Sequence, residues 1–161
     1  MPHLEAPGDD LASAPELPRK ARDALYENRT VLLFGEITTV LAERVAGELL
    51  ALAAAGDEPI RMLIHSPGGH VEAGDTIHDV IRFIRPAVHV VGTGWVASAG
   101  ALVYCAAEKQ HRFALPHTRF LLHQPMGGVR GPASDVEIEA EQIAAMKARL
   151  HRIFAAATGD R

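Results

Sequence analysis

The sequence contains one cysteine, Cys105, in 161 residues, so no disulfide can form within the chain. This scarcity fits a reducing compartment. Cys105 lies in the apolar stretch 101–107, where we interpret it as a small buried hydrophobic residue. No apolar run approaches the ~20 residues of a membrane span, and the N-terminus lacks the basic and apolar regions of a secretory signal. We therefore expect a cytoplasmic protein that does not bind membranes.

The chain also lacks a cluster of basic residues. It has 16 Lys and Arg against 20 Asp and Glu, with a formal net charge of −4 and a pI near 6.1. This balance argues against nucleic acid as the main partner and leaves small or peptide substrates open. No lysine of a phosphate-binding loop follows Gly127 and Gly128. We expect no metal and no other cofactor. Four histidines lack both the spacing of a zinc site and cysteine partners: His65, His70, His78 and His111.

The proportion of hydrophobic residues indicates one folded domain. Hydrophobic residues make up 48% of the chain and charged residues 22%, which is enough apolar material for a core in a domain of this length. Residues 1–18 are rich in proline and acidic residues and carry too little apolar surface to order themselves, so they are expected to form a disordered tail. Residues 19–161 form the predicted domain.

Strand and helix patterns alternate along this domain. Alternating or continuous apolar runs predict strands at 30–34, 60–64, 88–91, 112–114 and 118–122. Helical spacing predicts a short helix within 19–28, a helix capped by Thr38 or Thr39 and stopped at Gly56, and others at 71–84 and 98–107. A long helix is expected after Pro132, with Ser134 and Glu137 as a capping box. The pattern predicts an α/β fold with a mainly parallel sheet covered by helices.

Residues capable of chemistry follow three of these strands. Ser98 lies among small residues in the stretch 94–100, the sequence Ser66-Pro67-Gly68-Gly69 closes a second strand, and His123 closes a third. The carboxyl ends of parallel strands meet at one edge of a sheet, where sites commonly form. We therefore expect these three segments to lie close together.

Together the segments suit acyl transfer by a serine. A serine hydroxyl is a weak nucleophile and needs an adjacent imidazole to accept its proton, so Ser98 and His123 are the candidate nucleophile and general base. The backbone N–H groups of Gly69 and Ala99 are candidate donors to the oxyanion that develops on the attacked carbonyl. The residues themselves identify no group to orient the imidazole.

Each feature has an ordinary explanation when taken alone. Ser98 would cap a helix, Pro-Gly-Gly would be a tight turn, and His123 would be a hydrogen-bonded core or surface residue. Trp95 either narrows a substrate subsite or packs in the core. The joint placement of the three segments favours the catalytic interpretation.

The same segments resemble the proteolytic subunit of the ATP-dependent Clp protease, a serine peptidase. The resemblance rests on 66–69, on 94–100 around Ser98, and on Leu121-Leu122-His123-Gln124-Pro125 with the glycine pair at 127–128, and it extends from about Leu25 to Gly159. It implies a ClpP/crotonase-like fold with a long handle helix after Pro132. Its site residues map here to the nucleophile Ser98, the base His123, the oxyanion donors Gly69 and Ala99, and the substrate-binding residues Gly68, Gly127, Gly128 and Val129.

The resemblance also implies an assembly. Members of this family are endopeptidases that form heptameric rings, and two rings stack into a tetradecamer whose chamber encloses the active sites. A hexameric AAA+ ATPase unfolds protein substrates and feeds them in. The family's orienting aspartate lies after the long helix, beyond Arg161, so residues 19–161 are expected to lack the C-terminal part of the domain. Four aspartates do not match its position: Asp75, Asp79, Asp135 and Asp160.

Alternatives to an active Clp-type peptidase stay open from the sequence. The chain could be a weakly active or inactive structural subunit of a mixed ring, although it retains Ser98 and His123. A crotonase-like acyl-CoA enzyme would share the fold and the oxyanion donors. A membrane-associated peptidase with a Ser-Lys dyad would need a lysine base, and Lys109 lies in the wrong local context for that role.

Overall fold

A parallel five-stranded sheet forms the centre of the computed structural model, which describes residues 17–122 and 133–159. Its strands run in the order β1-β2-β3-β4, and β5 also pairs with β3. β4 pairs with residues 90–92 of β3 and β5 with residues 95–97, so the two short strands follow one another along the same edge. The strands are β1 (Thr30–Phe34), β2 (Ile60–Ser66), β3 (Val88–Ala97), β4 (Arg112–Ala114) and β5 (Arg119–Leu121).

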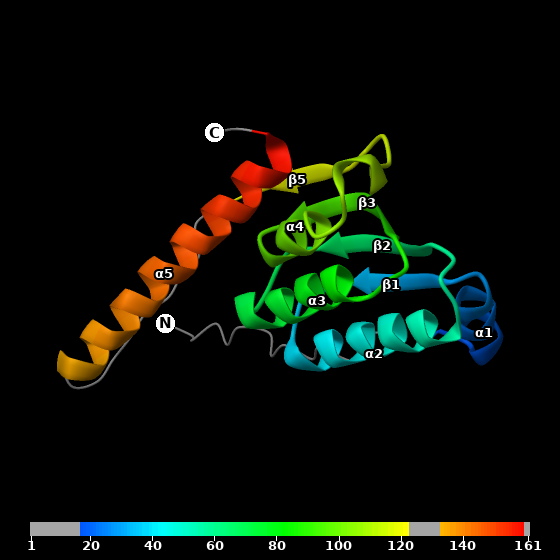
Figure 1. The fold of residues 1–161 in the computed structure, drawn as a ribbon, viewed down its shortest axis with the longest axis horizontal. Coiled ribbons are helices and arrows are strands. Elements are labelled where there is room, and N and C mark those ends of the chain that lie inside the picture. The colour runs from blue at the N-terminus through cyan, green and yellow to red at the C-terminus, as the bar shows by residue number, and fades with distance from the viewer. Residues whose placement is uncertain (1–16, 123–132, 160–161) are drawn as a thin grey trace, which may run out of the picture.

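Three helices, α2, α3 and α4, lie side by side in a layer against this sheet (Figure 1). α1 lies beside the start of β1, and the long α5 extends away from the body of the molecule. The helices are α1 (Arg19–Glu27), α2 (Thr39–Ala55), α3 (Val71–Phe83), α4 (Ala99–Tyr104) and α5 (Ala133–Thr158), with a 3-10 turn at Lys109–His111. These results confirm the predicted α/β fold with a parallel sheet.

α2 illustrates how the sequence specifies a helix. The Thr38 hydroxyl accepts a hydrogen bond from the Leu41 amide at 3.1 Å and so satisfies one of the unpaired N–H groups of the first turn. Its buried residues recur every three or four positions and so form one stripe that faces the sheet. They are Ala42, Val45, Leu49 and Leu52.

The two faces of the sheet differ in burial. On the helix side, alternate strand residues such as Leu33, Met62 and Val90 are fully buried. On the other side, the register aligns Leu32, Leu63, Val91 and Phe113 in one row across the sheet. Leu32, Leu63 and Val91 are half-buried and Phe113 is 48% exposed, so the described helices leave this apolar row partly open to solvent.

Several predicted boundaries needed correction. β3 continues to Ala97 instead of ending at Val91, because residues 95–97 pair with β5. α4 ends at Tyr104 instead of Ala107, and the Arg112 side chain binds the carbonyls of Cys105 and Ala107 beyond its end. α5 begins at Ala133, one residue before its predicted cap.

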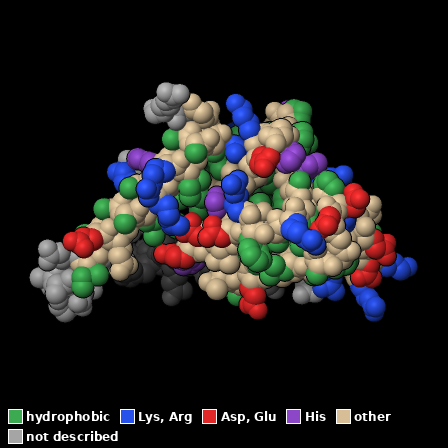
Figure 2. All heavy atoms as spheres, viewed as in Figure 1, with side chains coloured by type: hydrophobic (Ala, Val, Ile, Leu, Met, Phe, Trp, Pro, Cys, Tyr) green, Lys and Arg blue, Asp and Glu red, His purple; other side chains and the backbone are tan. Residues whose placement is uncertain are grey.

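The proposed division into a tail and one domain stays a prediction, because residues 1–16 lie outside the described ranges. Within those ranges, no helix is both long and apolar enough to cross a membrane. The face shown in Figure 2 carries side chains of both charge signs, interspersed.

Replacing Leu49 with Ala is expected to destabilise the fold by about 3 kcal/mol, because the side chain is fully buried and its removal leaves a cavity. Leu50→Ala is the matched control, since the adjacent leucine is 45% exposed and should cost only about 0.5 kcal/mol. Urea unfolding of both variants measures the difference. Equal losses would contradict the assigned burial of α2.

Candidate active site

Ser98 occupies a strained turn between β3 and α4. Its backbone angles are φ 51° and ψ −119°, a conformation that residues with a side chain rarely adopt and that costs about 1–3 kcal/mol. The Ser98 amide donates to the Leu121 carbonyl at 2.9 Å, and its own carbonyl accepts from the Ala101 amide at 2.9 Å. A sharp, strained turn from strand to helix is the geometry that presents nucleophilic serines in hydrolases.

The Ser98 side chain does not cap the helix that it precedes. It makes no capping hydrogen bond to the first turn of α4, and the residue is half-buried. This removes the ordinary explanation for a serine at the start of a helix. The hydroxyl is therefore not engaged by the helix and can face a substrate.

The turn after β2 packs directly against Ser98. A hydrogen bond of 2.8 Å joins the Ile37 amide to the Gly68 carbonyl, and the hydroxyl of the buried Ser66 accepts from the Gly68 amide at 3.1 Å. Gly68 has φ +104°, and a Cβ added there would lie 2.7 Å from the Ser98 Cβ and 3.3 Å from the Ser98 Oγ. Only glycine permits this approach, so the structure brings the segments around Ser98 and Gly68 together.

The predicted oxyanion donors lie on the two segments that meet here. Gly69 follows Gly68 with φ +149°, and Ala99 is the first residue of α4. Within 17–122 and 133–159, neither backbone amide donates a hydrogen bond to another group. Both amides therefore remain candidate oxyanion donors, a role that stays a prediction.

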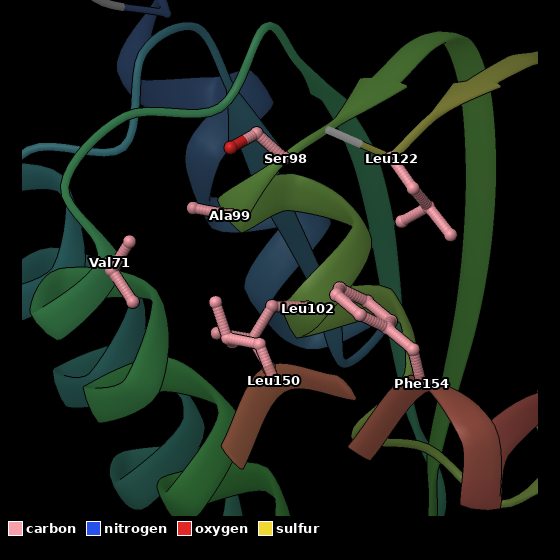
Figure 3. Close-up of a pocket in the computed structure, with 7 residues that line it drawn as sticks. All are labelled: Val71, Ser98, Ala99, Leu102, Leu122, Leu150 and Phe154. Carbon is pink, nitrogen blue, oxygen red and sulfur yellow. The ribbon is translucent and has the colours of Figure 1, made fainter. Parts of the chain in front are cut away.

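An apolar pocket lies beside Ser98 (Figure 3). It contains about 310 Å³ of empty space, part of it open to solvent. Leu150 and Phe154 reach from α5 toward Leu102 of α4, below the Ser98 hydroxyl. The residues that line the pocket are Val71, Ser98, Ala99, Leu102, Leu122, Leu150 and Phe154.

Comparisons with known proteins identify the family of this chain. The family model described as Clp protease matches residues 16–161. The chain is 55% identical over 152 residues to ATP-dependent Clp protease proteolytic subunit 3 of Rhizobium johnstonii, covering 94% of this chain and 78% of that protein. It is 56% identical over 132 residues to proteolytic subunit 2 of Pseudomonas aeruginosa, covering 82% and 66%.

The solved structure of ClpP1 from Listeria monocytogenes superposes with a TM-score of 0.78 at 51% identity, over 88% of this chain and 78% of that one. The chain belongs to the Clp protease family. It is therefore a Clp-type proteolytic subunit, a member of a serine peptidase family, with the ClpP fold. This assignment favours the peptidase over the acyl-CoA enzyme considered from the sequence.

Part of the predicted Clp site falls outside the described residues. His123, Gly127, Gly128 and Val129 belong to the segment 123–132, so the pairing of Ser98 with His123 stays a prediction. The last described residue before this segment, Leu122, lines the pocket beside Ser98.

Sequence reasoning did not identify the pocket walls contributed by the helices. Leu150 and Phe154 fall on the apolar stripe of α5, and Val71 on that of α3, so helical spacing marks all three as core residues. The same spacing arises whether a stripe meets solid core or lines a cavity. Only the tertiary arrangement distinguishes these cases.

Trp95 does not pack in the core of this Clp subunit. Its side chain is 39% exposed, and the Arg119 guanidinium carbon lies 5.0 Å from its ring centroid. The Trp95 amide donates to the His65 Nδ1 at 3.2 Å. This excludes the core interpretation, and the predicted contribution to a substrate subsite stays open.

Cys105 is half-buried rather than fully buried as predicted. Burial raises the pKa of its thiol, and the nearby Arg112 guanidinium lowers it to a smaller extent. A raised pKa disfavours the reactive thiolate, which argues against Cys105 as a nucleophile. No group of three or more His, Cys, Asp or Glu side chains among the described residues could hold a metal ion.

Gly68→Ala is expected to slow the reaction of Ser98 with a fluorophosphonate by about 100-fold, because the new Cβ would displace Ser98 by roughly an ångström. Gly35→Ala is the matched control: Gly35 has a similar φ of +95°, but no atom lies within 4 Å of an added Cβ. Both variants should lose stability from backbone strain.

Only Gly68→Ala should show a lower rate of Ser98 labelling per folded molecule. Intact-mass spectrometry after timed exposure to the probe measures this rate. Equal labelling rates in the two variants would contradict the close approach of Gly68 to Ser98.

Proposed function

We propose that this chain is a serine endopeptidase subunit in which Ser98 is the nucleophile, His123 the general base, and the amides of Gly69 and Ala99 the oxyanion donors. One observation carries the proposal. Ser98 is held in a strained conformation that exposes its hydroxyl between the Gly68 turn and an apolar pocket. A serine without a chemical role would relax to an ordinary helix cap.

The reaction follows acyl-enzyme chemistry. The Ser98 Oγ bonds to the carbonyl carbon of the peptide while the His123 imidazole accepts the hydroxyl proton. The carbonyl oxygen becomes an oxyanion that accepts hydrogen bonds from Gly69 and Ala99, and each such donor is worth about 3 kcal/mol in related enzymes. The C–N bond then breaks as His123 returns the proton to the departing amine. Water, deprotonated by His123, releases the acyl group by the reverse sequence.

The apolar pocket supports a preference for an apolar side chain on the residue whose carbonyl is attacked. Its walls beside Ser98 are aliphatic or aromatic: Val71, Leu102, Leu122, Leu150 and Phe154. A charged side chain placed there would lose its hydration without gaining a partner. We further propose that the backbone of Gly68, Gly127, Gly128 and Val129 binds the peptide main chain.

We do not assign the orientation of His123 to the two aspartates of α3. The Asp75 carboxylate binds the Arg149 guanidinium at 2.5 Å, and the Asp79 carboxylate lies 3.0 Å from the His78 Nδ1. Both carboxylates are engaged elsewhere. We propose that the orienting carboxylate is the one that follows the long helix in the Clp family.

We also propose that the subunits assemble into heptameric rings, stacked in pairs, and work with a Clp-type AAA+ ATPase in the cytoplasm. The relative from R. johnstonii is named a subunit of an ATP-dependent protease, which supports an ATPase partner. The partly open apolar row on the sheet supports burial against another chain, since parallel sheets are normally covered on both faces. Enclosure would protect other proteins from a peptidase of low specificity.

Ser98→Ala should lower kcat/KM for peptide cleavage by roughly 10⁴- to 10⁶-fold, because no other group supplies the attacking oxygen. Cleavage is measured with a fluorogenic peptide on the assembled full-length subunit, and sedimentation velocity should show unchanged rings. Retention of most activity by assembled Ser98→Ala would contradict the proposed nucleophile.

His123→Ala should lose activity to a similar extent, whereas His117→Ala, which removes an exposed histidine before β5, should retain it. The activity of the parent should fall as the pH is lowered, because a protonated imidazole cannot accept the Ser98 proton. Rate–pH profiles of the parent and of His117→Ala should coincide. Equal activity of the two alanine variants would identify a different base.

A further inference from the structure

Among residues 17–122 and 133–159, one wall of the pocket beside Ser98 makes few contacts with the other helices and strands. α5 supplies Leu150 and Phe154 to the pocket, yet Leu150, 8% exposed, is the one buried residue among its described side chains. The helix has 26 residues and extends well beyond the body of the molecule (Figure 1). The position of this wall therefore depends on the few contacts that hold α5.

Two arginine contacts fix α5 on either side of its pocket residues. Just before Leu150, the Arg149 Nη2 donates to the Asp75 Oδ2 at 2.5 Å. After Phe154, the Ala157 carbonyl accepts a hydrogen bond from the Arg112 Nη1 at 2.8 Å. Residues 149 and 157 lie about 12 Å apart along a helix, and Leu150 and Phe154 fall between them.

The Asp75 end of this ion pair belongs to the opposite wall of the pocket. Asp75 lies four residues after Val71 on α3, so the two side chains share one face of that helix, and Val71 lines the pocket. The Asp75 side chain is 16% exposed and that of Arg149 is 40% exposed, so water screens the pair only in part.

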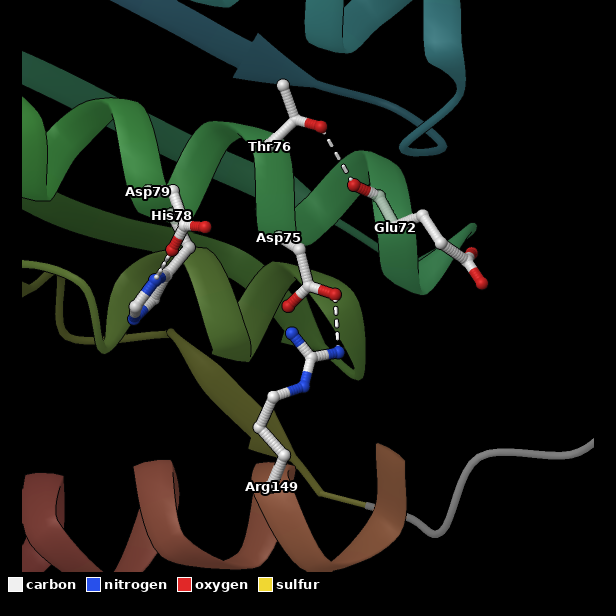
Figure 4. A network of polar contacts seen from close by, with 6 residues as sticks. All are labelled: Glu72, Asp75, Thr76, His78, Asp79 and Arg149. Carbon is white, nitrogen blue, oxygen red and sulfur yellow. Dashed lines mark hydrogen bonds and ion pairs between the residues drawn. The ribbon is translucent and has the colours of Figure 1, made fainter. Parts of the chain in front are cut away.

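Figure 4 shows the polar contacts around Asp75. Among the contacts drawn there, the Asp75–Arg149 pair is the one that joins two helices. The other contacts stay within α3: the Thr76 hydroxyl donates to the Glu72 carbonyl at 2.9 Å, and the His78 ring contacts Asp79. Arg149 immediately precedes the buried Leu150, so a movement of Arg149 would move the pocket wall with it.

We infer that Asp75 and Arg149 are positioning residues that set the width of the apolar pocket, and with it the preference for a bulky apolar side chain at the cleaved residue. The inference rests on the proposed function. Without the pair, α5 can shift away from α3, and Leu150 and Phe154 then lose contact with a long side chain in the pocket. A methyl group at the same position does not depend on these contacts.

The reactive turn itself is independent of the pair. Ser98 is held by Leu121 and by the turn at Gly68, and α5 contributes to neither contact. Loss of the ion pair should therefore change substrate binding and leave the reaction of the hydroxyl intact. This separates a positioning role from a general loss of structure.

The test compares two peptides that differ only in having leucine or alanine at the cleaved residue. For Arg149→Met in the assembled full-length subunit, the leucine-to-alanine ratio of kcat/KM should fall about fivefold, mainly through a higher KM for the leucine peptide. Asp75→Asn should give the same result with a nearly isosteric change. Arg149→Lys should retain most of the preference for the leucine peptide. Lysine keeps the positive charge, and the Asp75 pair is made through a single nitrogen.

Arg85→Met is the matched control, because Arg85 pairs with Asp57 at 3.1 Å through exposed side chains. It should leave the ratio unchanged. A small methyl fluorophosphonate should label Ser98 in all variants at rates within twofold of the parent.

An unchanged ratio in both Arg149→Met and Asp75→Asn, or an equal loss for the two peptides, would overturn the positioning role. If Arg149→Met fails to assemble, Asp75→Asn decides alone. Failure of the proposed function would look different: the unmodified subunit would then neither cleave either peptide nor react with the probe at Ser98.

Discussion

The conformation of Ser98 is the constraint on which the rest of the site depends. Its positive φ is unfavourable by about 1–3 kcal/mol and persists because the surroundings determine it on two sides. The Leu121 carbonyl holds its amide, and Gly68 packs against its side chain. The buried neighbours Val96 and Leu102 fix the strand before it and the helix after it. The hydroxyl is thereby kept out of the helix cap and beside the pocket.

The parallel register of the sheet brings these supports together. Ser66 aligns with Val96, and Ala97 aligns with Leu121, so β2, β3 and β5 end at the same edge. The turn carrying Gly68 and the residue Leu122 consequently flank the turn at Ser98. The register is itself determined by strand side chains that alternate between a buried face and a more open one. The hydrophobic pattern thus places chemically capable residues that are distant in sequence.

Local patterns were sufficient where local interactions decide the structure. The residue patterns of Thr30–Phe34 and Arg112–Ala114 predicted both strands with their observed bounds. Prediction was less accurate where pairing is long-range: β3 extends to Ala97 because of β5. The placement of Ser98 and Gly69 after strands, and of Ala99 at the start of a helix, was recognisable from the sequence. The strain at Ser98 and the pocket walls from α5 were not, because both arise from contacts between segments far apart in the chain.

The most direct test of the account is a crystal structure of the full-length subunit after reaction with a peptide phosphonate. We predict a covalent bond from the Ser98 Oγ to phosphorus, with a phosphonyl oxygen within hydrogen-bond distance of the Gly69 and Ala99 amides and the His123 ring beside the Oγ. The apolar group of the inhibitor should occupy the pocket of Leu150 and Phe154. An adduct on another residue, or an imidazole on the opposite side of the molecule from Ser98, would contradict the account.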